Sequence, residues 1–249
     1  MMLTRLCTLT LVLGVGAFAT TFGTNLIVNG DAESYTLVNP GVTFGVADFT
    51  DWTRTGHASY VNYPDFCCFH YVTDPGTEAF GAGYFLGGDQ ASSELTQSIF
   101  IGDQSALVDA GRVNFDMRGW LSSARQTATG AIDSVAFSVR FVDGLGNDLG
   151  GTGIASLDQA ELTALGSPVT SQGYFQLSVS QGLVPAGTRS LDVALLFTRF
   201  NGTILNAAAD NLGFQLIQTP EPGTFGLLLV ALGVLFGIHC TFQSKKCTS

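Results

Sequence analysis

Residues 133–143 read DSVAFSVRFVD, and apolar side chains occupy every second position from Val135 to Phe141. Successive side chains of an extended chain point to opposite faces, so this stretch has one apolar and one polar face. That division is typical of an antiparallel sheet that covers a core on one side only. The stretch therefore predicts a β-strand that buries Val135, Phe137, Val139 and Phe141.

The same period of two recurs along the chain from residue 25 to residue 218. The clearest examples are RVNFDMRG (112–119), RSLDVALLFTRF (189–200) and ADNLGFQLIQ (209–218). Shorter examples are NLIVNG (25–30), AGYFLGG (82–88), SELTQSIFI (93–101) and YFQLSVS (174–180). About eight such strands, separated by Gly, Asn, Asp and Pro, predict an all-β fold, an antiparallel β-sandwich or jelly roll over residues 20–218. Only LDQAELTAL (157–165) has helical character, and we expect one or two turns there.

The predicted sandwich is strongly acidic. Residues 20–218 contain nineteen Asp and Glu against seven Arg and no Lys, a net charge of −12. Such a surface repels nucleic acid and anionic lipid head groups, so we expect no nucleic-acid partner. It suits an extracellular domain that binds divalent cations or neutral glycans, although solubility alone explains it equally well.

Catalytic motifs are missing from the sequence. It contains no G-x-S-x-G, no H-E-x-x-H and no phosphate-binding glycine loop. The two histidines of the predicted sandwich, His57 and His70, lie in one aromatic stretch, and no pair of carboxylates stands out for glycoside hydrolysis. We therefore expect that the protein is not an enzyme.

The first nineteen residues, MMLTRLCTLTLVLGVGAFA, have the three parts of a secretory signal. Arg5 supplies the positive start, residues 6–15 the apolar run, and residues 17–19 an A-x-A cleavage site. The alternative is an uncleaved anchor helix, which the short apolar run disfavours. We expect cleavage after Ala19 and export of the remainder.

A second apolar segment lies near the other end of the chain. Pro220-Glu221-Pro222 stops the last strand, because proline lacks the N–H and restricts its predecessor. Residues 225–238 are uninterruptedly apolar, and the segment 223–242 is long enough, at about 30 Å as a helix, to cross a bilayer. Lys245 and Lys246 follow and predict a cytoplasmic C-terminus.

This tail, residues 219–249, resembles the PEP-CTERM sorting signal of exported Gram-negative bacterial proteins. Pro220-Glu221-Pro222 matches the motif, and the membrane span and basic residues follow in the family's order. The resemblance implies processing near the motif by an exosortase, a membrane transpeptidase, and a final place at the cell surface or in the extracellular matrix. Lys245 and Lys246 stand where the family usually has a dense arginine cluster.

The body resembles jelly-roll domains of the galactose-binding-like type, which include carbohydrate-binding modules. The resemblance lies in NLIVNGDAES (25–34) with Trp52, AGYFLGGDQASSELTQSI (82–99), VPAGTRSLDVALLF (184–197) and ADNLGFQLI (209–217). In such domains the first and last of these stretches meet and often bind a structural calcium ion. Carried over by position, this implies Glu33 and Asp210 as ligands, with Asp31 and Asp89 next. The alternative is that Asp210 caps a turn and Glu33 is solvated.

The stretch HASYVNYPDFCCFHYV (57–72) is unusually aromatic. Aromatic rings on loops can receive the apolar faces of sugars while neighbouring polar groups bind the hydroxyls. The predicted glycan-binding residues are Trp52, Tyr60, Tyr63, Phe66, Tyr71 and Asp65. The alternative is a loop folded over the core with the aromatic rings as its filling. Cys67 and Cys68 are adjacent, and a strained disulfide, an intermolecular link and two buried thiols all stay open.

Together these features predict an exported, exosortase-sorted surface or matrix protein whose β-sandwich binds exopolysaccharide, with calcium as a possible structural ion. The second hypothesis is a structural or adhesive envelope protein without a glycan site. In that case the aromatic stretch and Cys67-Cys68 would mediate contacts between proteins.

Overall fold

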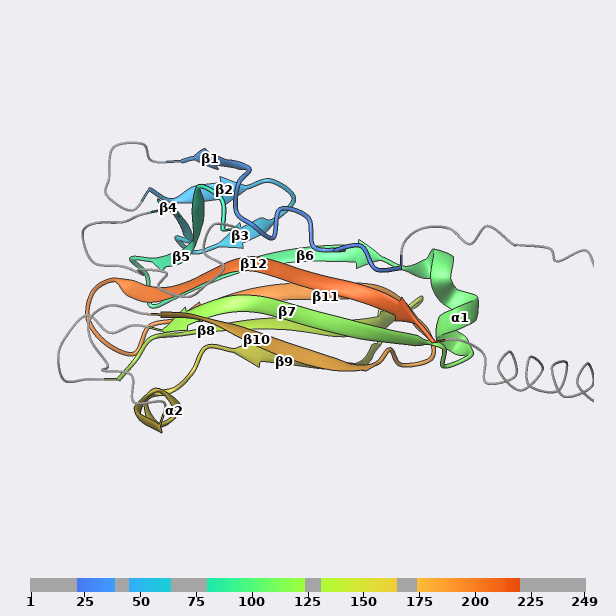
Figure 1. Ribbon diagram of the computed structural model, residues 1–249. Coiled ribbons are helices and arrows are strands. Elements are labelled where there is room, and N and C mark those ends of the chain that lie inside the picture. The colour runs from blue at the N-terminus through green and yellow to red at the C-terminus, as the bar shows by residue number, and fades with distance from the viewer. Residues whose placement is uncertain (1–21, 39–44, 64–79, 124–130, 165–173, 220–249) are drawn as a thin grey trace, which may run out of the picture.

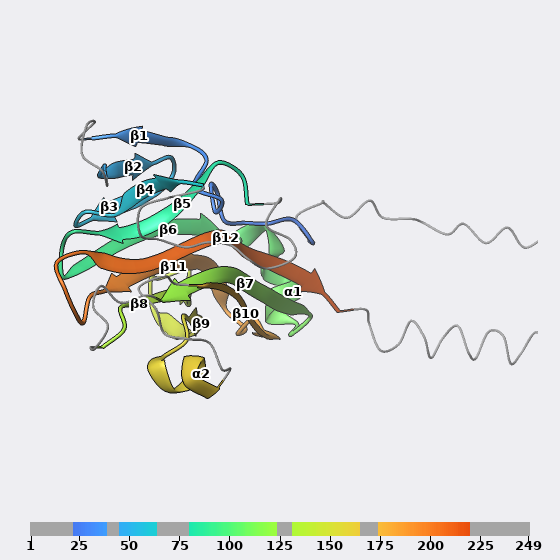
Figure 2. The same ribbon diagram turned by 60° about the vertical axis from the view of Figure 1, so that its left-hand side comes forward.

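The computed structural model describes residues 22–38, 45–63, 80–123, 131–164 and 174–219 (Figure 1). Two five-stranded sheets pack face to face, and every pair of neighbouring strands within them is antiparallel. This confirms the predicted all-β sandwich. The strands of both sheets run along the long axis of the molecule, as Figures 1 and 2 show.

We name each sheet after its central strand. The β12 sheet has the order β10 (Tyr174–Leu183), β7 (Val113–Ser123), β12 (Leu205–Gln218), β5 (Gly83–Gly88) and β4 (Ser59–Asn62). The β11 sheet has the order β3 (Thr53–Thr55), β6 (Ser92–Phe100), β11 (Thr188–Thr198), β8 (Ser134–Asp143) and β9 (Asp148–Ala155). A separate pair, β1 (Tyr35–Leu37) and β2 (Ala47–Phe49), lies beside β4 and β5.

The core lies between the two sheets and contains the predicted inward faces. On β8, Val135, Phe137, Val139 and Phe141 are all buried. The alternating apolar residues of β7, β11 and β12 are buried too: Val113, Phe115, Met117, Leu191, Val193, Leu195, Phe197, Leu212, Phe214 and Leu216. Phe141 of the β11 sheet bridges to the other sheet, with its ring 5.5 Å from Phe115 and 6.4 Å from Phe214, and these two rings are stacked on each other at 5.4 Å. The period of two therefore identified the core.

In the part of the chain that the structure describes, helix is confined to short connections. The helix α2 (Gln159–Ala164) lies within the predicted range 157–165. A second helical connection, between β6 and β7, was not predicted: a 3₁₀ turn at Gly102–Gln104 runs into α1 (Ser105–Asp109). Among the described residues, no helix is long and apolar enough to cross a membrane. The predicted signal (1–19) and the sorting segment after Thr219 lie outside the described residues.

The stretch 25–30 is not a strand, contrary to the prediction. Isolated backbone bonds join it to β12: the N–H of Leu26 donates to the carbonyl of Phe214 at 2.8 Å, and the N–H of Leu212 donates to the carbonyl of Gly30 at 2.9 Å. The side chain of Asn25 adds to them, because its Oδ1 accepts the N–H of Phe214 at 3.0 Å and its Nδ2 donates to the carbonyl of Leu212 at 2.9 Å, beside the irregular register between Asp210 and Gly213.

The first and last described residues lie at the same end of the sandwich. Phe22 forms a parallel bridge with Leu216, and the N–H of Thr219 donates to the carbonyl of Arg112 at 2.9 Å. Arg112 follows α1 directly, so both ends of the described chain lie at the α1 end (Figure 1).

Candidate functional site: a polar groove on the β11 sheet

The outer face of the β11 sheet carries three cross-strand rows of side chains. The middle row aligns Thr53, Thr96, Ala194, Ser138 and Gly153, each opposite the next. The second row aligns Ser98, Asp192, Arg140 and Gly151, and the third aligns Thr55, Glu94, Leu196, Ala136 and Ala155. Strands lie about 4.8 Å apart, so a row that crosses five strands is roughly 19 Å long.

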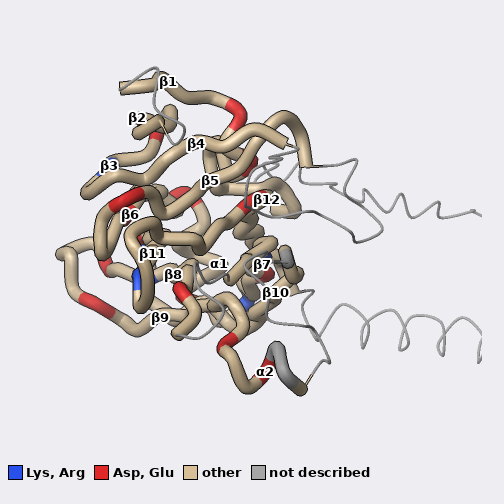
Figure 3. The backbone as a smooth tube through the Cα atoms, turned by 90° about the vertical axis from the view of Figure 1, so that its left-hand side faces the viewer, with Lys and Arg blue, Asp and Glu red and all other residues tan. Residues whose placement is uncertain are grey.

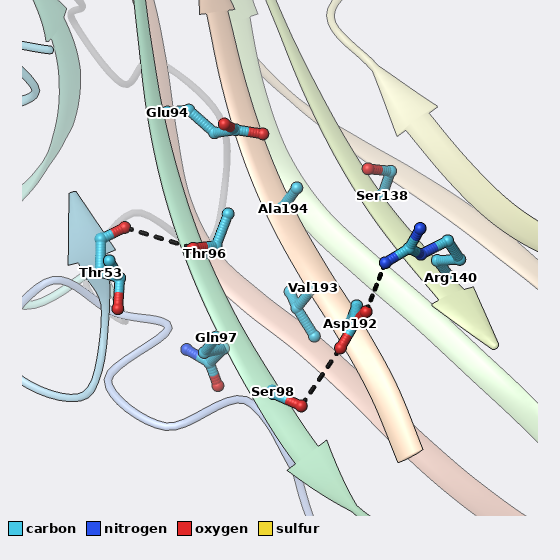
Figure 4. A pocket seen from close by; sticks show the side chains of 10 residues that line it. All are labelled: Thr53, Glu94, Thr96, Gln97, Ser98, Ser138, Arg140, Asp192, Val193 and Ala194. Carbon is cyan, nitrogen blue, oxygen red and sulfur yellow. Dashed lines mark hydrogen bonds and ion pairs between the residues drawn. The ribbon is translucent and has the colours of Figure 1, made fainter. Parts of the chain in front are cut away.

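A groove of about 530 Å³ opens on this face (Figure 4). Its lining comes from four strands and consists of Thr53, Glu94, Thr96, Gln97, Ser98, Ser138, Arg140, Asp192, Val193 and Ala194. A small residue in the centre, Ala194, keeps the floor low. Hydroxyl, amide, carboxylate and guanidinium groups surround it, and none of the ten lining residues is aromatic.

One end of the groove is an ion-pair network. Asp192 accepts from Arg140 Nη2 at 2.6 Å and from the hydroxyl of Ser98 at 3.2 Å (Figure 4). A second acidic residue, Asp148, lies 4.0 Å from Arg140 Nη1. The hydrogen bond that Arg140 donates to Asp192 raises the pKa of Arg140, so the guanidinium stays charged, and the carboxylate beside it balances that charge. Arg140 thus brings no net positive charge to the groove.

Glu94 lies at the other end of the groove. Within the described residues, the structure gives its carboxylate no hydrogen bond and no ion pair, and Figure 4 shows it extending from β6 without a partner. Its direct cross-strand neighbour is Leu196, an exposed apolar side chain. The groove therefore combines one paired carboxylate, one paired guanidinium and one free carboxylate.

The arginines of the described chain are engaged by the protein itself. Four form ion pairs: Arg54 with Asp48 at 2.8 Å, Arg118 with Asp116 at 2.6 Å, Arg140 with Asp192, and Arg189 with Asp109 at 2.8 Å. Arg199 donates to the carbonyls of Asp89 at 2.8 Å and Thr203 at 2.6 Å. Acidic positions are spread over the molecule, with few basic ones between them (Figure 3). An anionic ligand would meet no unpaired arginine among these five.

Two of the predicted glycan-binding residues have a packing role in the structure instead of the exposed position that the prediction requires. Trp52 and Tyr60 are each only 7% exposed. The Trp52 Nε1–H donates to the carbonyl of Asn29 at 3.2 Å, and its ring lies edge-on to Phe85. Tyr60 is stacked on Tyr35 with ring centroids 3.7 Å apart. The covered rings leave no open face for a sugar.

Tyr63 belongs to an aromatic cluster on the outer face of the β12 sheet. Its ring lies 4.8 Å from Tyr84, 6.1 Å from Phe80 and 6.2 Å from Phe175. Trp120 joins the cluster through an edge contact with Phe80 at 5.0 Å. The other predicted residues, Asp65, Phe66 and Tyr71, lie outside the described residues, as do Cys67, Cys68 and His70.

The predicted calcium ligands Glu33 and Asp210 lie in the same region, on either side of Tyr63. Asp210 is fully buried; its Oδ2 accepts from the Tyr63 hydroxyl at 3.0 Å and its Oδ1 from the N–H of Asn211 at 2.7 Å. Glu33 Oε1 accepts the N–H groups of Ala82 at 2.7 Å and Gly83 at 3.1 Å, next to Tyr63. Gly81 lies so close that a Cβ there would overlap the Glu33 carboxylate.

The charges of these carboxylates influence one another. Burial raises the pKa of Asp210 to about 8, and the negative charges of Glu33 and Asp31 add to the rise. Asp31 Oδ1 lies 3.5 Å from the N–H of Glu33. Asp89 lies apart, after β5, where it bonds to His57 Nδ1 at 2.6 Å. Among the described residues, no group of three or more His, Cys, Asp or Glu is placed to hold a metal ion.

The sequence contained a signal for the groove that the prediction did not use. That signal is the polar face of each alternating strand, which includes Ser138, Arg140 and Asp192. The prediction used only the apolar face, because the apolar residues define the core. That β6, β11 and β8 are neighbours cannot be read from their order in the chain, and the groove exists only because they are.

Comparisons with known proteins give a limited result. No protein-family model matches the chain, and no curated protein matches its sequence. Among solved structures, it is similar to the enzymatically active domain of bacteriophage CBA120 tailspike protein 4, with 17% identity and a TM-score of 0.43 over 78% of this chain and 21% of that chain. It is also similar to the CBM22-1 xylan-binding domain of Paenibacillus barcinonensis Xyn10C, with 14% identity and a TM-score of 0.38 over 81% of this chain and 100% of that chain. A family 16 carbohydrate-binding module is similar with 13% identity and a TM-score of 0.39 over 76% of this chain and 99% of that chain. With TM-scores below 0.5, these likenesses carry no weight in assigning a function.

Proposed function

We propose that this is an exported, non-enzymatic protein whose groove on the β11 sheet binds extracellular polysaccharide. The observation that carries the proposal is the middle row of that face, Thr53–Thr96–Ala194–Ser138–Gly153, in which hydroxyl groups flank a low floor. A polysaccharide presents hydroxyl groups along an extended chain, and Ser and Thr hydroxyls both donate and accept. A row of roughly 19 Å matches a ligand of several sugar rings.

The C–H faces of the sugar rings would lie on small or aliphatic side chains. Ala194 lies on the floor and exposed Leu196 at the margin, and no lining residue offers a ring for stacking. Binding would therefore depend on hydrogen bonds to Thr96, Ser138 and the carboxylates. Individual contacts of this kind are modest, so repeated sites on a long polymer would raise the overall affinity.

A variant that fills the groove tests the proposal. Ala194→Phe places a ring on the floor between Thr96 and Ser138, whereas Val179→Phe places the same ring on an exposed position of β10 in the other sheet. Binding of the whole chain to host exopolysaccharide is measured by affinity electrophoresis. We expect loss of binding for Ala194→Phe alone, with the melting temperatures of both variants close to wild type. Equal binding by both would exclude the groove.

We further propose export with cleavage after Ala19 and exosortase processing at Pro220-Glu221-Pro222, on the sequence features of the two ends. The last described residue, Thr219, lies two residues before Glu221 at the exposed end of the sandwich, which gives a processing enzyme access. Intact mass of the exported protein is the test. We expect a C-terminus close to Pro222, and a mass that still includes Ser249 would contradict processing.

Calcium is proposed as a structural ion at Glu33 and Asp210. A buried carboxylate with two neutral hydrogen-bond partners supports this proposal, because a cation would compensate its charge and Ca²⁺ prefers oxygen ligands. Because fewer than three such side chains gather there, backbone carbonyls would have to complete the six to eight oxygens that Ca²⁺ takes. When bound, the ion would supply the positive charge that Asp210 lacks.

The alternative is a structural or adhesive protein without a glycan site. It would be favoured if the whole chain bound no polysaccharide, with or without calcium, while non-reducing electrophoresis showed linked oligomers.

A further inference from the structure

The charge of the groove allows a sharper statement about its ligand, which rests on the proposed function. We infer that the groove selects polysaccharides that carry free ammonium groups, such as partly de-N-acetylated amino-sugar polymers, and that Glu94 binds the ammonium group. The inference combines three observations: a free carboxylate, a neutralised guanidinium and the field of the whole body.

Glu94 is the first of these. It lies at one end of the groove, and within the described residues its carboxylate has neither a hydrogen bond nor an ion pair. A carboxylate accepts hydrogen bonds only, and an ammonium group offers three donors and an opposite charge. A neutral hydroxyl could also donate to Glu94, but it would leave the charge uncompensated.

The cation in the groove is not available to an anionic ligand. Arg140 is held by Asp192 at 2.6 Å and lies 4.0 Å from Asp148. The charged residues that line the groove are Glu94, Asp192 and Arg140, and together they leave it with one negative charge. A uronic-acid polymer would meet repulsion from Glu94 without a free cation to offset it.

The charge of the rest of the protein also favours a cationic ligand. Residues 20–218 carry a net charge of −12 and contain no lysine, so the field of the body draws cationic polymers towards the surface. This field alone would attract a polycation anywhere on the protein. What makes the groove specific is Glu94 beside an apolar neighbour, Leu196, on the face whose hydroxyl rows fit a sugar chain.

Each part of an amino-sugar unit has a counterpart on this face of the sheet. Its hydroxyl groups would bond to Thr96 and Ser138, the C–H face would lie on Leu196, and the ammonium would pair with Glu94. N-acetylation removes the positive charge and adds bulk at that nitrogen. The inference therefore predicts a preference for glucosamine units over N-acetylglucosamine units.

The test compares two probes that differ only in acetylation: glucosamine oligomers and N-acetylglucosamine oligomers of equal length. Calorimetry on the whole chain in detergent measures both, with neutral glucan and xylan oligomers alongside. We expect wild type to bind the glucosamine oligomer about fivefold more tightly than its acetylated partner, as one partly exposed ion pair allows. Glu94→Gln, which keeps the shape and loses the charge, should remove the preference.

Asp103→Asn is the matched control. Asp103 is exposed in the 3₁₀ turn beyond the far end of β6, so the variant removes the same charge from the body but not from the groove. It should keep the preference. Equal losses in Glu94→Gln and Asp103→Asn would show attraction to the acidic surface in general and overturn the inference.

The outcomes separate the inference from the function on which it rests. Equal or tighter binding of acetylated or neutral oligomers, abolished by Ala194→Phe, would overturn the ammonium preference and leave polysaccharide binding in place. No binding of any oligomer or of host polysaccharide would overturn both. Unchanged melting temperatures of Glu94→Gln and Asp103→Asn exclude unfolding as a cause.

Discussion

The hydroxyl of Tyr63 donates a 3.0 Å hydrogen bond to Asp210, a residue 147 positions later in the chain. The bond joins the segment after β4 to the central strand β12 on the outer face of the β12 sheet. Asp210 is fully buried there, and Tyr63 lies within the aromatic cluster. The pair gives this face a polar centre inside an apolar surround.

Removing that hydroxyl should destabilise the protein. In Tyr63→Phe the ring still packs, but Asp210 Oδ2 loses its donor, at a cost of about 1–3 kcal/mol for an unsatisfied buried group. Urea unfolding gives the change. A double-mutant cycle with Asp210→Asn isolates the pair, and additive effects of the two variants would mean that the bond contributes nothing.

The stability of calcium-free protein should fall as pH rises. Burial raises the pKa of Asp210 from 3.8 to about 8, so between these values the unfolded chain has released a proton that the folded chain still holds. The contribution of Asp210 to the free energy of unfolding is complete below about pH 4. It is lost as pH rises to about 8, by up to roughly 1.4 kcal/mol per pH unit. Urea unfolding in chelator at pH 5, 6 and 7 should show a steeper fall for wild type than for Asp210→Asn. Equal slopes would contradict it.

Calcium should raise the melting temperature and weaken that pH dependence, because a bound cation favours the ionised carboxylate. Asp210→Asn and Glu33→Gln should lose the calcium response. Asp89→Asn is the control and should keep it, since Asp89 is engaged with His57 away from the site. Scanning calorimetry with millimolar calcium or chelator decides, and identical melting curves for wild type would exclude the ion.

Replacement of Asn25 should cost more than its place in a loop suggests. Asn25→Ala removes three hydrogen bonds, two to β12 and one to the N–H of Ile27, worth about 2–3 kcal/mol together. Asn114→Ala, on the outer face of β7, should change the free energy of unfolding by less than about 0.5 kcal/mol. The two are compared by urea unfolding, and equal effects would mean that the Asn25 bonds are dispensable.

Two glycines with similar backbone angles should respond differently to alanine. Gly88 (φ +89°) and Gly146 (φ +86°) both require the left-handed region, at a cost of about 1 kcal/mol for alanine. A Cβ on Gly88 would also overlap the carbonyl oxygen of His57, whereas Gly146 has open space. We expect more than about 3 kcal/mol for Gly88→Ala and about 1 kcal/mol for Gly146→Ala in urea unfolding. Similar values would show that the chain around His57 moves easily.

The fold could be predicted from sequence because burial repeats with the period of the strand. Phe137 and Leu195 follow that period, and both are fully buried. The stretch 25–30 shows the limit of such a pattern: its apolar residues suit a strand, yet isolated backbone bonds and the Asn25 side chain join it to β12 without a regular ladder. Local composition does not reveal which partner satisfies a backbone group.

The site was harder to predict because it depends on which strands are neighbours. The meeting of Glu33 with Asp210 followed from the resemblance to jelly-roll domains, and the structure places the two near one another. Trp52 and Tyr60 drew attention as sugar platforms by residue type, yet the same large apolar surface makes them core residues. Glu94 and Arg140 attract no notice in sequence, because a charge on the polar side of a strand is ordinary.

The first and last described residues, Phe22 and Thr219, lie at the α1 end of the sandwich, and this has a mechanical consequence. If the protein is attached through the segment that follows Thr219, the attachment lies at one narrow end, and the strands point away from the anchoring surface. The outer face of the β11 sheet then stands upright, open from the side along its full height. A polymer crossing the strands at right angles would run parallel to that surface, so neighbouring anchored copies could hold one fibre at a constant height above it.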